Sequence, residues 1–335
     1  MQPLLSRLAI DPYIVAIVSM VGLATLLPAH GAGVAYANGA TVAAIALMFF
    51  LQGARLAPSA ALAGASHWRL HLVVFLSTFA LFPLLGLAAR AVAPGLLTPP
   101  LWSGVLLLCM LPSTVQASIA FTSIARGNVP AAICSATASN LLGIVVTPLL
   151  AALLLRTQGG FSAHGVGDIL LQLLLPFAAG QAARPWIGAW AARNKTLVGL
   201  ADRGSILLIV YAAFSEGVTH GIWHQVDLAQ MAKLVAVDAA LLGTVLLATA
   251  GLARALRFNR ADAITIIFCG SKKSLASGLP MAGILFAGQP VGLIILPLML
   301  FHQIQLMTCA TLARRFAAAG QTTHKAPAGA SQAAA

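Results

Sequence analysis

From residue 268 to residue 280 the chain reads Phe-Cys-Gly-Ser-Lys-Lys-Ser-Leu-Ala-Ser-Gly-Leu-Pro. Two lysines, three serines and two glycines thus interrupt a region that is otherwise hydrophobic enough to cross a membrane. A charged side chain inside a span costs about 2.5 kcal/mol or more, so such residues usually face the protein interior or a water-filled cavity. The glycines and the proline also predict a broken helix, and broken backbone at membrane depth must be buried in protein or line a cavity. The stretch therefore predicts a transport site.

The composition of the chain predicts an all-α integral membrane protein. Hydrophobic residues make up 60% of the 335 residues and charged residues only 8%, whereas a soluble domain carries about 25% charged residues. The short segments of alternating hydrophobicity that a membrane barrel needs are absent. The four cysteines lie in apolar runs without a CxxC pair or a His/Cys cluster, so we expect neither a metal site nor a disulfide framework.

Ten apolar segments are candidates for helices that cross the membrane, each needing about 20 residues. Their expected ranges are 12–28, 38–54, 68–89, 101–125, 129–154, 167–188, 203–219, 229–252, 261–287 and 289–312. Turn and charge signals such as Pro99-Pro100 and Gly159-Gly160 separate them. The polar and alanine-rich residues 321–335 predict a disordered tail.

The positive charges predict the orientation of these spans. With ten spans both termini lie on one side, and of the 19 lysines and arginines only Arg90, Arg156 and Lys233 fall on the opposite side. Lys272 and Lys273 fall inside a span. Because positive residues collect in cytoplasmic loops, we expect both termini in the cytoplasm. Topology, and not nucleic-acid binding, therefore explains the net charge of +12.

Five spans followed by five spans predict two inverted repeats, at about 11–157 and 166–313. The fourth span of the first half is broken by Pro112, and the fourth span of the second half is broken at 270–274. Interrupted spans at corresponding positions indicate a transporter binding site, although a proline kink without a function would give a similar pattern. The ends of half-helices carry partial charges, so two crossing breaks would form sites for anions and cations.

The candidate substrate- and ion-binding residues lie in the two breaks, in the fifth span and in the eighth. They are Ser113, Thr114, Gln116, Ser118, Thr137, Asn140, Asp238, Ser271, Lys272, Lys273 and Ser274. Small polar residues such as Thr137 and Asn140 also serve as hydrogen bonds between helices. A carboxylate inside a span needs a partner, so Asp238 is expected to pair with Lys272 or Lys273, to act in transport or proton relay, or to be neutral or near an interface.

At the two breaks the chain resembles the bile-acid:sodium symporter-like superfamily, in the branch related to the seventh member of human solute carrier family 10 and its bacterial relatives. The resemblance is carried by Ala-Arg-Gly-Asn at 125–128 and by Cys-Gly-Ser-Lys-Lys-Ser-Leu-Ala at 269–276, and it covers about residues 10–315. It implies ten helices, a panel domain beside a core domain, and helices 4 and 9 crossing in the core. It also implies a secondary transporter of an organic, anionic solute that works by alternating access in the bacterial inner membrane.

At the expected sodium site, this chain differs from the sodium-coupled members of the superfamily. Those relatives carry a glutamate and a glutamine where this chain has Phe268 and Lys272, and Ser118 matches a sodium-site serine that is followed here by Ile119. An ammonium from Lys272 or Lys273 would fill the space of the sodium ion and repel it. We therefore expect transport that does not depend on sodium, and no cofactor. If transport is coupled to an ion after all, the resemblance implies that the ion is sodium.

Two other classes of function are weighed against transport. An enzyme would need a nucleophile–base pair or a metal cluster near one interface, and the sequence offers neither, so an enzyme is not expected. The alternative that remains is a membrane regulator of ion homeostasis that keeps the transporter fold without transporting. The expected partners are a small organic solute and the lipid bilayer but no nucleic acid, and the sequence makes no prediction of an oligomeric state.

Overall fold

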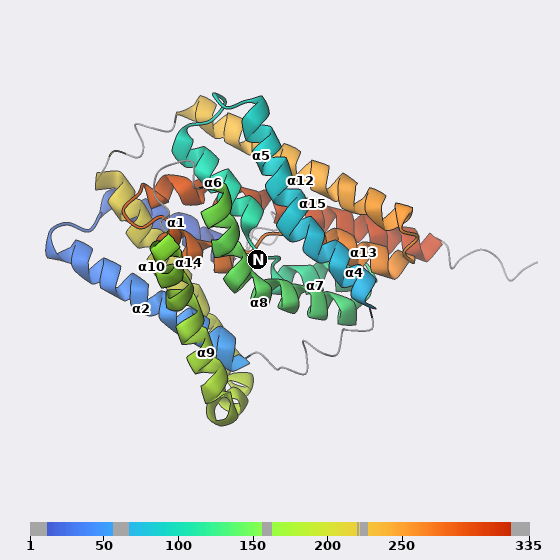
Figure 1. The fold of residues 1–335 in the computed structure, drawn as a ribbon, viewed down its shortest axis with the longest axis horizontal. Coiled ribbons are helices and arrows are strands. Elements are labelled where there is room, and N and C mark those ends of the chain that lie inside the picture. The colour runs from blue at the N-terminus through green and yellow to red at the C-terminus, as the bar shows by residue number, and fades with distance from the viewer. Residues whose placement is uncertain (1–11, 56–66, 156–162, 220, 222–226, 323–335) are drawn as a thin grey trace, which may run out of the picture.

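A computed structural model describes residues 12–55, 67–155, 163–219, 221 and 227–322, and every regular element in these ranges is a helix (Figure 1). The expectation of an all-α membrane protein is confirmed. The helices are α1 (Pro12–Leu26), α2 (Ala32–Arg55), α4 (Trp68–Leu76), η3 (Ser77–Leu81), α5 (Phe82–Val92), α6 (Pro99–Met110), α7 (Val115–Ile124), α8 (Val129–Leu154), α9 (Ala163–Arg193), α10 (Lys195–Thr219), α12 (Leu228–Ala255), α13 (Arg260–Gly270), α14 (Leu275–Leu285) and α15 (Val291–Thr322).

Each of the ten expected ranges contains helix, but not every helix qualifies as a span by length and hydropathy. In the described residues six helices qualify, or seven if the pair α6 and α7, bent by 61° at its break, counts as one. The six are α2, the continuous run from α4 to α5, α8, α10, α12 and α15. Ten crossings would also need α1, α9 and the broken pair α13–α14, so the number ten stays a prediction.

The last helix is longer than the sequence predicted. We expected it to end at residue 312, whereas α15 continues to Thr322 through a segment rich in alanine, a strong helix former. The helix thus includes Gln321 and Thr322, the first two residues of the expected tail, and the rest of that tail lies outside the described residues, so its disorder stays a prediction. The expected outer loop at Arg156 also lies outside them.

Helices α1, α2, α9 and α10 pack against one another as one group, and α2 lies along α9 at the lower left of Figure 1. Two glycines allow this contact. A Cβ atom on Gly53 of α2 would collide with the carbonyl oxygen of Phe177, and one on Gly180 of α9 would collide with that of Phe50. Small residues let the backbones of membrane helices approach closely, and these two positions require glycine for that reason.

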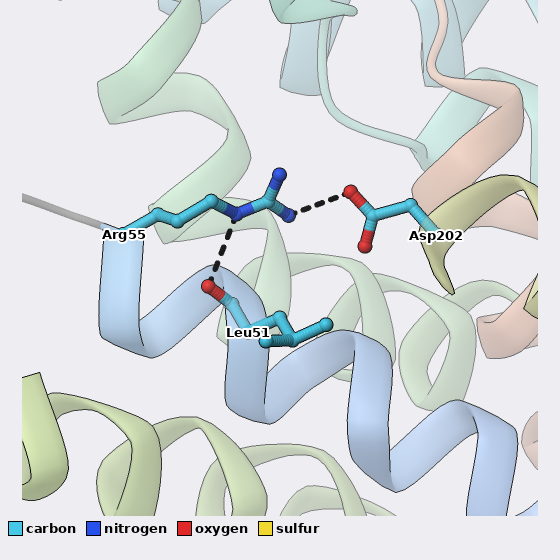
Figure 2. A network of polar contacts seen from close by, with 3 residues as sticks. All are labelled: Leu51, Arg55 and Asp202. Atoms are coloured by element: carbon cyan, nitrogen blue, oxygen red, sulfur yellow. Dashed lines mark hydrogen bonds and ion pairs between the residues drawn. The ribbon is translucent and has the colours of Figure 1, made fainter. Parts of the chain in front are cut away.

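An ion pair fastens α2 to α10 at the end of the same group (Figure 2). A guanidinium nitrogen of Arg55, the last residue of α2, lies 2.7 Å from a carboxylate oxygen of Asp202 in α10. The Nε of Arg55 also donates a hydrogen bond of 3.1 Å to the carbonyl oxygen of Leu51, which fixes the direction of the side chain. Both charged groups are partly exposed, so the pair is worth about 0–1 kcal/mol.

Helices α5, η3, α8, α14 and α15 surround α6. Every residue of α6 from Leu101 to Met110 is buried, so only the first turn of this helix reaches the surface. It packs on α5, α8, α14 and α15, while α7 packs on α8, α13 and α15. Polar groups at the end of α6 must therefore be satisfied by other parts of the protein, and the break after α6 is where the candidate site lies.

Candidate functional site

The two breaks have the same length and meet each other. Residues 111–114 separate α6 from α7, and residues 271–274 separate α13 from α14. The backbone N–H of Ser274 donates to the carbonyl oxygen of Pro112 at 2.9 Å. The hydroxyl of Ser113 donates to the carbonyl oxygen of Cys269 at 2.7 Å. The contact that the sequence predicted between the two breaks is therefore present in the structure.

The carbonyl groups at the end of α6 take their hydrogen bonds from side chains of other helices. A helix leaves its last four carbonyls without partners inside the helix. The Nζ of Lys273 donates to the carbonyl oxygens of Cys109 and Leu111, at 2.7 Å each. The hydroxyl of Thr147 in α8 donates to the carbonyl oxygen between them, that of Met110, at 2.8 Å. Lys273 thus acts as a charged cap on the broken helix.

A third carbonyl for Lys273 comes from a π-helical turn. In η3 the backbone N–H of Phe82 donates to the carbonyl oxygen of Ser77, five residues back. The next bond of this pattern would join residue 83 to Thr78, but Pro83 has no N–H group. The carbonyl oxygen of Thr78 is consequently left for the Nζ of Lys273, which lies 2.7 Å away.

All three protons of the Lys273 ammonium are therefore used, although the side chain is fully buried. The negative end of the α6 dipole faces this charge, and the ring of Phe82 lies 4.2 Å from the nitrogen, close enough for a cation–π interaction. Gln305 of α15 accepts from the backbone N–H of Lys273 at 3.0 Å and donates to its carbonyl oxygen at 2.9 Å. Both the backbone and the side chain of Lys273 are fixed.

Lys272 has a different environment. Its Nζ lies 4.0 Å from the ring centroid of Phe121 and 4.9 Å from that of Phe268, and the residue is fully buried. In the described residues this nitrogen has no hydrogen-bond partner, and the hydroxyls of Ser271 and Thr122 have none either. A buried ammonium without an oxygen acceptor is costly, so the environment of Lys272 is less favourable than that of Lys273.

The end of α13 is capped by hydroxyl groups instead of an ammonium. Besides the bond from Ser113, the hydroxyl of Ser118 donates to the carbonyl oxygen of Phe268 at 3.4 Å. The two serine hydroxyls lie 3.3 Å apart. The backbone N–H of Ser113 in turn donates to the hydroxyl of Ser139 in α8, at 3.0 Å. The two half-helices are therefore stabilised in chemically different ways.

Of the other predicted site residues, some join the hydrogen-bond network of the two breaks and some do not. Ser274 caps α14 by accepting from the backbone N–H of Ser277 at 3.2 Å, and the Ser277 hydroxyl donates to Asn140 at 2.7 Å. Three predicted residues do not join the network within the described part of the chain: Thr114 and Thr137 are half-buried, Gln116 is exposed, and their side chains form no hydrogen bond there.

Asp238 does not form the expected ion pair. Its side chain is fully buried on α12, and in the described residues neither carboxylate oxygen has a hydrogen-bond partner. The three donors of the Lys273 ammonium are all used by carbonyl oxygens. Lys272 lies against two aromatic rings and beside the thiol of Cys309. The pairing with either lysine is thus not formed in this structure, and Asp238 lies outside the network of the two breaks.

The site also contains residues that the sequence analysis did not select, namely Thr78, Cys109, Ser139, Thr147, Ser277 and Gln305. Gln305 had a usable signal, because an amide within a buried apolar helix needs partners. Thr78 and Cys109 contribute only carbonyl oxygens, which no side-chain pattern can reveal.

The Ala-Arg-Gly-Asn signature forms a clamp beside the site. Asn128 begins α8 by accepting from the backbone N–H of Ala131 at 3.1 Å, and its amide donates to the carboxylate of Asp262 in α13 at 2.7 Å. Gly127 permits the approach, because a Cβ atom there would lie 2.7 Å from a methyl carbon of Ile264. The signature therefore joins the beginning of α8 to the beginning of α13.

A helical membrane protein in which two broken helices meet at a buried polar site has the architecture of a secondary transporter. The sequence model of the SBF-like CPA transporter family matches residues 11–318. The chain belongs to this family. It is 53% identical over 308 residues to "Putative symporter YfeH" of Escherichia coli, covering 92% of this chain and 93% of the relative. It is 29% identical over 314 residues to "Sodium/bile acid cotransporter 7" of Rattus norvegicus, covering 91% and 92%.

Proposed function

We propose that the chain is a secondary transporter that moves an organic anion across the membrane by alternating access and without sodium. Membership of the transporter family and the names of the relatives, a symporter and a cotransporter, support transport over catalysis. The observation that carries the proposal is the position of Lys273, whose ammonium neutralises the carbonyl groups of Cys109 and Leu111 at the end of a broken helix.

The physical argument against sodium is electrostatic. Carbonyl oxygens at the end of a half-helix are the groups that coordinate cations in transporters with broken helices. Here a tethered ammonium already lies on them. A sodium ion about 4 Å from that ammonium would be repelled by roughly 4 kcal/mol at an effective dielectric constant of 20, which corresponds to nearly a thousandfold in affinity. Transport should therefore draw its energy from another source.

The argument for an anionic solute comes from Lys272. Its ammonium lies against the rings of Phe121 and Phe268 with no oxygen acceptor in the described residues, and the Ser271 hydroxyl has no partner there either. A carboxylate or sulfate would give this ammonium a charge-assisted hydrogen bond. In this proposal Lys272 binds the anionic solute, and Lys273 stabilises the broken helix when no solute is bound.

The arrangement of the helices supports the remaining parts of the proposal. In this proposal the group α1, α2, α9 and α10, whose helices pack on one another, forms the panel domain, and the helices around the two breaks form the core domain. With α1, α9 and α13–α14 crossing as well, ten crossings would form two inverted repeats. Both termini would then lie in the cytoplasm, in keeping with the bias of lysine and arginine, and the membrane would be a bacterial inner membrane.

Proteoliposomes containing the purified full chain test the proposal. Uptake of a panel of radiolabelled carboxylates and sulfated anions, taurocholate among them, is measured under an inward sodium gradient and under an equal potassium gradient. We expect one class of anion to be taken up equally in both, and Lys272→Gln to abolish its uptake. Uptake driven by sodium alone would contradict the role given to Lys273. Absence of uptake for every anion would favour a membrane regulator that keeps the transporter fold.

A further inference from the structure

A lateral groove lies between α12 and α15, with α13 as its floor. It encloses about 610 Å³ and is lined mainly by apolar residues, among them Leu247, Ile267, Met307 and Leu312. Gly243 lies in its wall, and a Cβ atom there would meet nothing within 4 Å, so the groove is open at this glycine. The volume is in the range of cavities that bind small molecules, about 300–1,000 Å³.

The walls of the groove face the lipid. Leu247 is 77% exposed and Met307 is 72% exposed, and both belong to helices that are long and apolar enough to cross a membrane. Large apolar side chains exposed on membrane-spanning helices contact acyl chains, because those helices are surrounded by hydrocarbon. The apolar lining and the lipid-facing side chains of the groove therefore suit an acyl chain.

One end of the groove is positively charged. Arg315 is the one charged residue that lines it, and in the described residues its guanidinium forms no hydrogen bond or ion pair. Arg260 at the start of α13 donates to the carbonyl oxygen of Phe316, so the ends of α12 and α15 and the start of α13 lie together, on the right of Figure 1. Arg254, Arg257 and Arg314 belong to the same end of the molecule.

We propose that this groove is a binding site for one anionic phospholipid of the surrounding bilayer. An acyl chain lies along α12 and α15, and the phosphate pairs with the guanidinium of Arg315. Arginine is well suited to phosphate because its planar fork forms two parallel charge-assisted hydrogen bonds. Basic pockets between membrane helices are sites for anionic head groups. A zwitterionic lipid would offer the same acyl chain but no net charge for Arg315.

The lipid would contact residues that position the central site. Phe316 lines the groove, and its ring lies 6.0 Å from that of Phe268 in a T-shaped contact. The ammonium of Lys272 lies 4.9 Å from the centroid of the same Phe268 ring. Occupancy of the groove would thus limit the movement of Phe316 and, through it, of Phe268. This role in lipid binding does not depend on the identity or existence of a transported solute.

The test uses the delipidated full chain in detergent, with phosphatidylglycerol or phosphatidylcholine of identical acyl chains as the added probe. Native mass spectrometry counts bound lipid, and thermal unfolding measures the stabilisation. We expect phosphatidylglycerol to bind one molecule more tightly than phosphatidylcholine. Arg315→Gln should weaken its binding by about tenfold, the effect of one lost charge-assisted contact, whereas Arg314→Gln, with the same change of charge, should leave it intact.

A second pair of variants tests the apolar part. Gly243→Leu places a side chain in the groove, where its Cβ atom meets nothing within 4 Å, and should abolish tight binding. Gly251→Leu, on the same helix with equally open space and outside the groove, should not.

Equal losses in Arg315→Gln and Arg314→Gln would overturn the proposal, because they would show attraction by net charge alone. Unchanged binding in Gly243→Leu, or equal binding of the two lipids, would overturn it as well.

Discussion

The ammonium nitrogen of Lys273 lies 2.7 Å from the carbonyl oxygen of Leu111, a residue 162 positions earlier in the chain. This contact joins the break of one half of the sequence to the broken helix of the other half. It also means that a covalently attached cation occupies the end of α6. The effect of this contact on protein stability can be measured separately from its effect on solute binding.

Lys273→Met should destabilise the protein strongly, because it leaves the carbonyl oxygens of Thr78, Cys109 and Leu111 buried without donors. We expect a loss of about 3 kcal/mol or more in the free energy of unfolding. Lys272→Met is the matched control, since it removes a neighbouring ammonium that has no acceptor in the described residues. It should change stability by less than about 1 kcal/mol or increase it.

A thiol-reactive dye can report both unfolding curves, since all four cysteines are buried. Equal effects of the two substitutions would show that the ammonium of Lys273 does not carry the interactions assigned to it.

Asp238→Asn should not destabilise the protein. The carboxylate of Asp238 is fully buried and has no partner in the described residues, so an amide of the same shape removes a charge that nothing compensates. We expect the free energy of unfolding to rise or to stay within about 0.5 kcal/mol. Asp202→Asn, which breaks the ion pair with Arg55, should lower stability by up to about 1 kcal/mol. A large loss in Asp238→Asn would mean that the carboxylate has a partner.

Asn128→Ala should loosen the clamp between α8 and α13. The substitution removes both the N-terminal cap of α8 and the hydrogen bond to Asp262. The two losses together should cost about 1–3 kcal/mol. Asn128→Asp preserves the cap but places a second carboxylate against Asp262, so it should be destabilising too, and more so at neutral than at acidic pH. Thermal unfolding at two pH values checks both, and full stability of Asn128→Ala would contradict the clamp.

Gly53→Ala should disrupt the contact between α2 and α9. A Cβ atom at Gly53 collides with the backbone of Phe177, and a backbone carbonyl cannot move aside as a flexible side chain can. A loss of about 1–3 kcal/mol is expected from this overpacking. Gly39→Ala, in the same helix with nothing within 4 Å, should be neutral or slightly stabilising because alanine favours helix. The comparison of their melting temperatures isolates the packing effect from helix propensity.

Alkaline phosphatase and fluorescent-protein fusions check the orientation. Phosphatase fused after Ala32 or after Ala163 should be active, because both positions are expected on the outer side of the inner membrane. Fluorescent protein fused after Arg193 should fold and fluoresce in the cytoplasm. The opposite pattern would overturn the topology derived from the lysines and arginines.

The sequence predicted the helices and the meeting of the two breaks well, because Pro112 and the Gly-Ser-Lys-Lys segment are local signals for broken helices in an apolar chain. It did not separate the roles of Lys272 and Lys273. Adjacent residues of a break can point to opposite sides, and the acceptors of Lys273 are carbonyl oxygens of distant helices, so the assignment required coordinates. The pairing of Asp238 failed for the same reason, since hydropathy shows that a carboxylate is buried but not what surrounds it.

The π turn η3 determines one of the three acceptors of Lys273. A π turn holds one residue more than a regular α-helical turn, so it is equivalent to a one-residue insertion in the helix that runs from Trp68 to Val92. Together with Pro83, that extra residue leaves the carbonyl of Thr78 free for the ammonium of Lys273. Deleting a single residue between 77 and 81 would restore a regular helix, in which the carbonyl groups of this turn bond within the helix. The set of acceptors around Lys273 therefore depends on the number of residues in this turn as well as on the lysine itself.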